Sequence, residues 1–240
     1  MYYNKAMRIN KFLATSGLAS RRKVEEYVLA GRVSVNGQVV KELGTDVSEK
    51  DVVTVDGKKV YLPTTKLYFV VNKPVGYVTT AHDPFERKTV MDLIPNSFGR
   101  VFPIGRLDFN TTGMLLFTND GNFANSIMHP SKEITKKYEA TLAKELKRED
   151  IAKIEAGIEI DGRKTAPSKV QKLKPLGEER ARAIITIHEG RNREVRKLFE
   201  AVGNRVVTLK RIQIGKLELG DLPVGKYRKL TKEDIKLIFQ

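Results

Sequence analysis

The sequence predicts an α+β fold with a mostly antiparallel mixed sheet flanked by helices. Stretches with the period-two alternation of strands outnumber stretches with helical periodicity. The strands and helices do not follow one another as regular βαβ units, so a fully parallel sheet is not expected. A change of pattern near residue 61 separates a small N-terminal α/β module from a larger second domain.

The small module begins with two predicted helices. Ile9, Phe12 and Leu13 recur at helical spacing, and Gly17 is placed to end this first helix. Ser20 is a predicted N-cap for a second helix, which stops near the next glycine in the chain. Two short helices are therefore expected at the start of the chain.

Short strands complete the module. The stretch RVSVNGQVV alternates on either side of Asn36-Gly37, a strong signal for a β-hairpin, and DVVTVDGKKV continues the strand pattern. A proline and two threonines interrupt the pattern in YLPTTK. We therefore predict a first domain over residues 7–60, a linker over residues 61–66 and a second domain over residues 67–240.

The second domain interleaves strands with helices. The predicted strands have the sequences LYFVVNKP, MLLFTND, KKYEATLA and RARAIITIH. The predicted helices have the sequences NFANSIM, REDIAKIEAGI and NREVRKLFEAVG.

The chain carries an excess of positive charge. Its 44 lysines and arginines outnumber its 29 acidic residues, for a formal net charge of +15. This excess favours a nucleic acid, or else an anionic membrane surface, as partner. No apolar run approaches the roughly 18 residues of a membrane span, MYYNKAMRINKF has no signal-peptide core, and cysteine is absent. We therefore predict a cytoplasmic monomer that binds nucleic acid and no membrane.

Three consecutive cations, Arg21, Arg22 and Lys23, occupy the first turn of the second predicted helix. Cations at that position oppose the helix dipole at a cost of about 0.3–1 kcal/mol each, and a repeated local conflict of this kind is typical of a functional site. Together with Arg8 and Lys11 on the neighbouring helix, they would form a cationic face for a phosphate backbone. The alternative is an ordinary solvated charged face.

Several cofactor-dependent chemistries lack their sequence signatures. The chain has no Walker-type phosphate loop and no G-x-G-x-x-G turn. Its histidines are scattered without metal-ligand spacing, and no D-x-D or similar pair suggests a two-metal nuclease. We therefore predict no cofactor and no metal. The chemistry that remains uses one carboxylate together with arginine and tyrosine side chains.

The stretch GRLDFNTTG sets one carboxylate, Asp108, between two apolar runs. A buried carboxylate close to RNA phosphates needs a cation, and Arg106 would share its face in an extended conformation. Further cations come from a predicted helix, capped by Asn192, whose beginning carries Arg191, Arg193 and Arg196. A buried arginine–aspartate pair would keep Asp108 ionised as nucleophile or base. The alternative is an aspartate that caps a turn.

The first module resembles a known RNA-binding domain. The stretch RINKFLATSGLASRRKVEEYVLAGRVSVNGQVV is similar to the small module named after the ribosomal S-four protein, over about residues 7–54. In that family two helices and a turn bind structured RNA. The resemblance implies that the partner is RNA and not DNA.

The second domain resembles bacterial ribosomal pseudouridine synthases of the RsuA/RluB group over most of residues 67–230. GRLDFNTTGMLLFTNDG is similar to the signature of this family, NKPVGYVTT to its first motif and EGRNREVRKLF to its last motif. The resemblance implies that Asp108 is the catalytic residue and that Tyr138 of KKYEATL stacks on the target base. An ordinary core aromatic is the alternative for that tyrosine.

Three further roles follow from the same resemblance. Val195 would pack beneath the site, Arg196 would pair with Asp108, and Arg106 would occupy the space that a flipped base vacates. A phosphate contact is the alternative for Arg106. Two more arginines, Arg191 and Arg193, are expected to bind RNA.

The implied activity is the isomerisation of a specific uridine in ribosomal RNA to pseudouridine, which needs no cofactor because nothing is oxidised or transferred. TNDGNFANSIMHPSKEITKKY is more similar to members that act on large-subunit RNA than to the small-subunit member. A small-subunit target and a non-catalytic RNA-binding assembly factor are the alternatives, and a metal-dependent ribonuclease is a weaker one.

Overall fold

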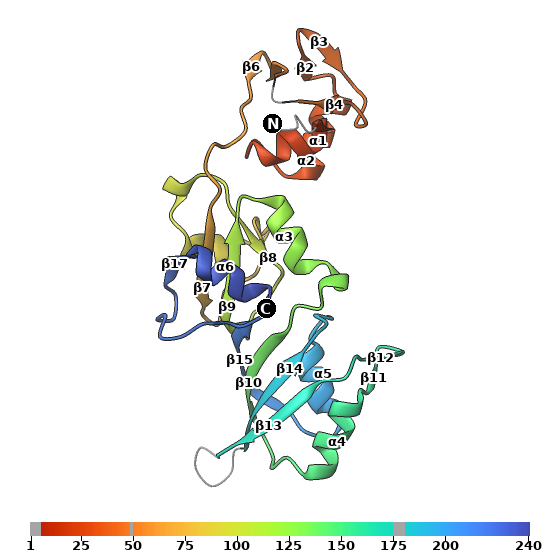
Figure 1. Cartoon of the computed structure of the whole chain (residues 1–240), viewed down its shortest axis with the longest axis vertical. Helices are drawn as coiled ribbons and strands as arrows, with labels where there is room; N and C mark the ends of the chain where they lie inside the picture. The colour runs from red at the N-terminus through yellow and green to blue at the C-terminus, as the bar shows by residue number, and fades with distance from the viewer. Residues whose placement is uncertain (1–5, 49, 175–180) are drawn as a thin grey trace. The chain divides into compact units, whose positions relative to one another are not determined.

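The computed structural model describes residues 6–48, 50–174 and 181–240 of the chain. The first five residues lie outside the described residues. So does Arg180, which we expected at the start of the strand RARAIITIH. The chain forms two compact units. The first consists mainly of the residues up to Leu67, with the short segments 96–101 and 119–121, and the second contains most of the rest (Figure 1).

The first unit contains two helices and six short strands among its described residues. Its elements are β1 (Met7–Arg8), α1 (Ile9–Thr15), α2 (Arg21–Leu29), β2 (Val33–Val35), β3 (Gln38–Val40), β4 (Asp46–Val47), β5 (Val53–Val55) and β6 (Lys58–Lys59). Four strands form a sheet in the order β3-β2-β5-β6, and β1 pairs with β4. All of these pairs are antiparallel.

The local signals of this unit act as predicted. The hydroxyl of Ser20 accepts a hydrogen bond from the backbone N–H of Lys23 at 3.2 Å, so Ser20 caps α2. Asn36 and Gly37 both have positive φ angles, 51° and 84°, which a two-residue hairpin turn requires. Apolar side chains of both helices and of the sheet form one core, with Ile9 and Val28 fully buried.

One expectation for this unit is wrong. Arg8 does not lie on the first helix with Lys11, because α1 begins only at Ile9 and Arg8 belongs to the short strand β1. Its guanidinium donates a hydrogen bond to the carbonyl of Gly44 and forms an ion pair with Asp46 at 3.6 Å. Arg8 lies beside β4 because its backbone pairs with Asp46 of that strand and does not continue into the helix.

The second unit is built on a long sheet. Its strands are β7 (Tyr68–Lys73), β8 (Phe102–Ile104), β9 (Thr112–Thr118), β10 (Lys136–Leu142), β11 (Glu159–Ile160), β12 (Arg163–Lys164), β13 (Lys169–Leu173), β14 (Ala181–Ile187), β15 (Val206–Ile214), β16 (Leu217–Glu218) and β17 (Tyr227–Lys229). The helices are α3 (Gly121–Met128), α4 (Arg148–Ala156), α5 (Glu194–Ala201) and α6 (Lys232–Ile238), with 3-10 turns at η1 (Val90–Leu93) and η3 (Pro130–Lys132). A further 3-10 turn, η2 (Asn96–Phe98), belongs to the first unit.

The sheet is mostly antiparallel, as predicted. Seven strands follow the order β13-β14-β10-β15-β9-β7-β17, with β16 beside β15 and β8 beside β9. Among the described strands of this sheet, only β15 and β9 run parallel. The two outer strands β11 and β12 form a separate hairpin. The α+β class expected from the sequence is confirmed.

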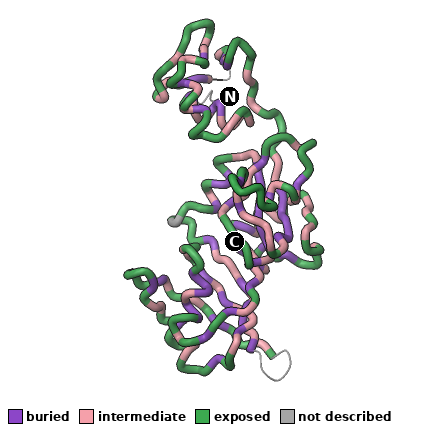
Figure 2. Tube along the Cα trace, turned by 180° about the vertical axis from the view of Figure 1, so that it is seen from behind, coloured by how far each residue is buried: buried purple, intermediate pink, exposed green. Residues whose placement is uncertain are grey.

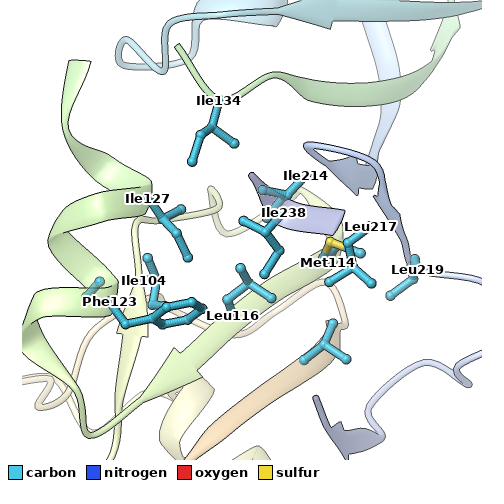
Figure 3. Packing of buried hydrophobic residues seen from close by; sticks show 12 residues of the cluster. Ile104, Met114, Leu116, Phe123, Ile127, Ile134, Ile214, Leu217, Leu219 and Ile238 are labelled. Atoms are coloured by element: carbon cyan, nitrogen blue, oxygen red, sulfur yellow. The ribbon is translucent and has the colours of Figure 1, made fainter. Parts of the chain in front are cut away.

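A hydrophobic cluster joins one part of the sheet to α3 and α6. Phe123 and Ile127 of α3, Leu116 of β9 and Ile238 of α6 turn toward one another in Figure 3. Burial of a side chain of this size contributes about 1.5–3 kcal/mol. Ile104, at the end of β8, belongs to the same cluster, so the loop that follows β8 begins from a fixed point.

The distribution of burial agrees with a sheet covered by helices. Buried backbone runs through the interior strands of the second unit, whereas exposed residues follow its loops (Figure 2). In β10 every second residue is buried, from Tyr138 through Ala140 to Leu142, as its period-two sequence predicts.

The start of α5 differs from the expectation. Asn192 does not cap this helix; the N-cap position is Arg193, in the left-handed conformation with φ 53° and ψ 29°, and its side chain makes no capping hydrogen bond. The carboxylate of Glu194 instead accepts a hydrogen bond from the backbone N–H of Arg191 at 2.9 Å.

Candidate active site

A cavity of about 710 Å³ opens within the second unit. Its walls come from the loop between β8 and β9, from α3 and the segment after it, from β10, from the end of β14 and the loop that follows, and from β15. Four of the predicted residues, Arg106, Asp108, Tyr138 and Val195, line this cavity together. A site of this volume is in the range of small-ligand pockets.

Asp108 lies half-buried in the loop between β8 and β9. Leu107, immediately before it, is buried, and its carbonyl accepts a hydrogen bond from the hydroxyl of Thr79 at 2.7 Å. The carbonyl of Asp108 accepts one from the backbone N–H of Thr111 at 3.0 Å, which closes a turn. The backbone on both sides of the carboxylate is therefore fixed.

A buried lysine donates hydrogen bonds to the backbone of the same loop. Lys73, at the end of β7, is fully buried, and its ammonium donates hydrogen bonds to the carbonyls of Pro74, Asp108 and Thr111 at 3.0, 3.1 and 2.9 Å. Burial lowers the pKa of Lys73 to about 8, and the carboxylate of Asp108 opposes that change. One cation thus donates to three carbonyl oxygens at the two ends of this loop and at Pro74.

Arg196 acts on the loop in a related way. We expected it to pair with Asp108, but no ion pair within 4.0 Å joins these side chains among the residues that the structure describes. The buried guanidinium instead donates to the carbonyls of Val206 and Asn110, both at 3.1 Å. The reason is geometric: the side chain reaches the backbone two residues beyond Asp108, where its donors satisfy buried carbonyls.

The charge of Arg196 is nevertheless within electrostatic range of the carboxylate. Burial lowers the pKa of Arg196, the positive charge of Arg193 lowers it further, and the negative charge of Asp108 opposes both effects. Lys73 and Arg196 therefore bring two buried positive charges near Asp108 while they bind the backbone of its loop.

Tyr138 presents its ring to the cavity from β10 and is only 8 % exposed. On the neighbouring strand β15, Arg211 lies opposite it in the register. The Nη1 atom of Arg211 donates to the hydroxyl of Tyr138 at 3.4 Å, and its guanidinium carbon lies 6.0 Å from the ring centroid. The tyrosine is thus held at its hydroxyl end while its ring borders open space.

The other predicted residues that line the cavity differ in how far they are exposed. Arg106 and Arg193 are exposed, whereas Val195 is buried in the wall. Arg191 forms an ion pair with Glu189 at 2.7 Å and donates to the carbonyls of Arg163 and Lys164. Its guanidinium therefore fixes the loop before α5 to β12, in addition to any contact with RNA.

Two titratable groups in the cavity wall have shifted pKa values. Burial raises the pKa of Glu194, while the hydrogen bond from Arg191 lowers it. Burial lowers the pKa of Lys136, and the positive charge of Arg211 adds to this effect. Ionisable groups with such shifts are typical of functional sites.

The predicted RNA-binding residues of the first unit lie on β1, α1 and α2. Arg21, Arg22 and Lys23 are exposed in the first turn of α2, and Lys11 is half-buried on α1. Lys23 forms an ion pair with Glu26 at 2.5 Å.

The sequence alone did not point to Lys73, which binds the Asp108 loop, or to Arg211, which binds Tyr138. The signal for Lys73 is a lysine at the end of the apolar run YFVVNK, directly before a proline. Arg211 sits in the alternating stretch VVTLKRIQI, where a charge on the buried face is the corresponding signal.

Within the described residues, no group of histidine and acidic side chains is arranged to hold a metal ion. In the same part of the chain, every helix is too short or too polar to cross a membrane.

Comparisons with known proteins name the class to which this fold and this cavity, with Asp108 among its ionisable side chains, belong. Residues 67–201 match the sequence model of the family described as RNA pseudouridylate synthase, and residues 7–53 match that of the S4 domain. The first match covers more than half of the chain. The chain therefore belongs to the RNA pseudouridylate synthase family.

Individual relatives are similar to this chain over nearly its full length. The ribosomal large subunit pseudouridine synthase B of Bacillus subtilis (strain 168) is 46 % identical over 95 % of this chain and 94 % of its own. An uncharacterized RNA pseudouridine synthase of Aquifex aeolicus (strain VF5) is 42 % identical over 98 % of this chain and 94 % of its own. A crystal structure of a pseudouridylate synthase, 30 % identical, matches with a TM-score of 0.70 over 97 % of this chain and 99 % of that chain.

The predicted resemblance to pseudouridine synthases that carry an S-four-type module is thus confirmed, as is the predicted enzyme class, an isomerase acting on RNA.

Proposed function

We propose that this enzyme converts one uridine of large-subunit ribosomal RNA to pseudouridine, with Asp108 as the catalytic carboxylate. The observation that carries the proposal is the cavity in which Asp108 and Tyr138 meet, in a chain similar along its whole length to a ribosomal large subunit pseudouridine synthase. Ribosomal RNA is a polyanion, which agrees with the net charge of +15.

The proposed reaction begins when the target uridine leaves its stack and enters the cavity, at a cost of a few kcal/mol. Arg106, exposed at the rim, fills the space that the base leaves. Asp108 then starts cleavage of the C1′–N1 bond, either by attack at C1′ or by removal of a proton from the sugar. The freed uracil turns against Tyr138 and rejoins through C5, whose proton is released.

In this proposal Lys73 and Arg196 are positioning residues. Their hydrogen bonds to the backbone of residues 108, 110 and 111 hold the carboxylate in one place, and such positioning is worth several kcal/mol in a reaction barrier. Val195 supplies an apolar surface under the uracil.

RNA binding is proposed for both units. Arg21, Arg22, Lys23, Lys11 and Arg8 of the first unit, together with Arg191 and Arg193 of the second, contact phosphates. The enzyme is proposed to act as a monomer and to work in the cytoplasm, where ribosomes are assembled.

Mapping of pseudouridine in the ribosomal RNA of cells with and without the gene tests the proposal. We expect one pseudouridine of the large-subunit RNA to disappear with the gene and to return with the wild-type copy. Loss of a small-subunit pseudouridine instead would contradict the large-subunit assignment. Unchanged RNA would identify a binding factor without this activity.

A further inference from the structure

Arg211 lies on β15, between the strand β10, which carries Tyr138, and the strand β9, which follows the loop of Asp108. In the sheet, β15 has β10 on one side and β9 on the other, and Arg211 lies opposite Tyr138 of β10 and Gly113 of β9. Gly113 has φ 103°, and a Cβ atom there would lie 2.2 Å from the carbonyl oxygen of Arg211. A glycine is therefore required for this close approach.

The guanidinium of Arg211 is buried, with 5 % of the residue exposed. Its Nε atom donates to the carbonyl of Met114 at 2.7 Å and its Nη1 atom to the hydroxyl of Tyr138. Its Nη2 atom is buried without a hydrogen-bond partner among the described residues. Leaving a charged donor unsatisfied costs more than leaving a neutral one, so this atom is prepared for an acceptor that the protein itself does not supply.

Arg211 lines the cavity wall, so a ligand that enters the cavity comes within reach of its guanidinium. Thr111, also in the wall and 2 % exposed, likewise has a buried hydroxyl with no hydrogen-bond partner among the described residues. The ammonium of Lys136 is close enough to Arg211 that the two charges affect each other. This wall therefore favours a ligand that accepts hydrogen bonds and carries or develops negative charge.

A uracil ring fits this description better than a phosphate does. The guanidinium carbon of Arg211 lies 6.0 Å from the ring centroid of Tyr138, against which a flat group can stack, and uracil offers two carbonyl acceptors at its edge. When the C1′–N1 bond breaks, its electron pair stays with uracil and spreads over N1 and both carbonyl oxygens. This is true whether the carboxylate attacks C1′ or removes a sugar proton.

We propose that the guanidinium of Arg211 donates a hydrogen bond to a carbonyl oxygen of the target uracil and stabilises the uracil anion between cleavage of the C1′–N1 bond and formation of the C5–C1′ bond. The inference rests on the proposed function. When C5 bonds to C1′, the bond from Asp108 to C1′ breaks or the sugar proton returns. C5 loses its proton, N1 gains one, and nothing is oxidised or reduced. Arg211 is then a catalytic residue, since it touches the reacting base.

The test compares Arg211→Met with Lys210→Met, a neighbouring cation on the same strand that does not line the cavity. Single-turnover conversion is measured with RNA that carries uridine or 5-fluorouridine at the target site. Fluorine withdraws electrons and makes the departing base a more stable anion. Loss of each nucleoside is followed by nuclease digestion and chromatography, and RNA affinity is measured separately.

Arg211→Met should slow uridine conversion by about 10²-fold, the usual loss for one electrostatic donor, with a clearly smaller loss for 5-fluorouridine. RNA affinity and the Lys210→Met rates should stay near wild type. Equal losses for both nucleosides, or weaker RNA binding as the main effect, would overturn the inference and indicate a phosphate contact.

If Arg211→Met does not fold by thermal melting, Arg211→Lys carries the test, because it keeps the charge but not the fork of donors. It should slow uridine more than 5-fluorouridine, and wild-type rates would contradict the inference. A wild-type enzyme that converts no uridine would instead overturn the proposed function itself.

Discussion

The two units of this enzyme carry their positive charge in opposite ways. In the first, Arg21, Arg22 and Lys23 are exposed on one turn of α2. In the second, Lys73 and Arg196 are buried and donate to backbone carbonyls of the loop that carries the proposed catalytic carboxylate. Exposed cations bind RNA and are screened by salt, whereas buried cations determine the shape of a site. Substitutions in the two groups should therefore change different measured quantities.

The largest difference is expected between two arginines of one segment. Arg196→Met removes hydrogen bonds to two buried carbonyls, and displacement of the Asp108 loop should lower kcat by about 10²-fold or more. Unfolding free energy should also fall by about 1–3 kcal/mol. The control, Arg193→Met, alters an exposed neighbour and should affect RNA affinity alone. Equal kcat values for the two variants would contradict the distinction.

A buried lysine should behave like the buried arginine. Lys73→Met leaves the carbonyls of Pro74, Asp108 and Thr111 without this donor, and we expect kcat to fall by about 10- to 100-fold. Lys88→Met, at an exposed position, is the matched control. Steady-state kinetics with saturating RNA distinguishes them; a loss in KM alone would show that Lys73 binds RNA.

Exposed cations should act on affinity. Arg21→Gln combined with Arg22→Gln should reduce the slope of log affinity against log salt by about 1.4–1.8, the value for two phosphate contacts. The control pair, Lys58→Gln with Lys59→Gln, removes the same charge from the exposed strand β6. Filter binding across a salt series measures both. Identical slopes for the two double variants would show that only net charge matters and would contradict a specific phosphate contact of Arg21 and Arg22.

The smallest effect concerns pH. Burial lowers the pKa of Lys73 from 10.5 to about 8, so between these values the unfolded chain binds more protons than the folded one. The lysine therefore makes unfolding free energy rise with pH across this window. Urea denaturation at about pH 7.5 and about pH 9.5 should show a larger rise for wild type than for Lys73→Met. A parallel response of both proteins would contradict the assignment.

Local signals in the sequence predicted most of the fold. Ser20 before α2, Asn36-Gly37 between β2 and β3, and the alternation of KKYEATLA each act through neighbours in the chain. The start of α5 could not be predicted in this way, because the helix begins one residue later than expected, after Arg193 in the left-handed conformation.

The site was predictable only in part. The motif resemblance indicated Asp108 and Tyr138, and the structure brings both to one cavity. The partners of Arg196 and Lys73 are backbone carbonyls, which every residue possesses and which no sequence pattern marks. Arg211 becomes noticeable only when its unsatisfied Nη2 atom is seen in the folded protein.

The central claim is that the carboxylate of Asp108 carries out the chemistry while the cations around it position or bind. Asp108→Asn keeps the size of the side chain and the backbone hydrogen bonds of the loop, so the most direct measurement is its single-turnover rate on a target-containing fragment of large-subunit RNA. We predict that pseudouridine formation becomes undetectable while RNA affinity and thermal stability stay close to wild type. Pseudouridine formed at the wild-type rate would contradict the account.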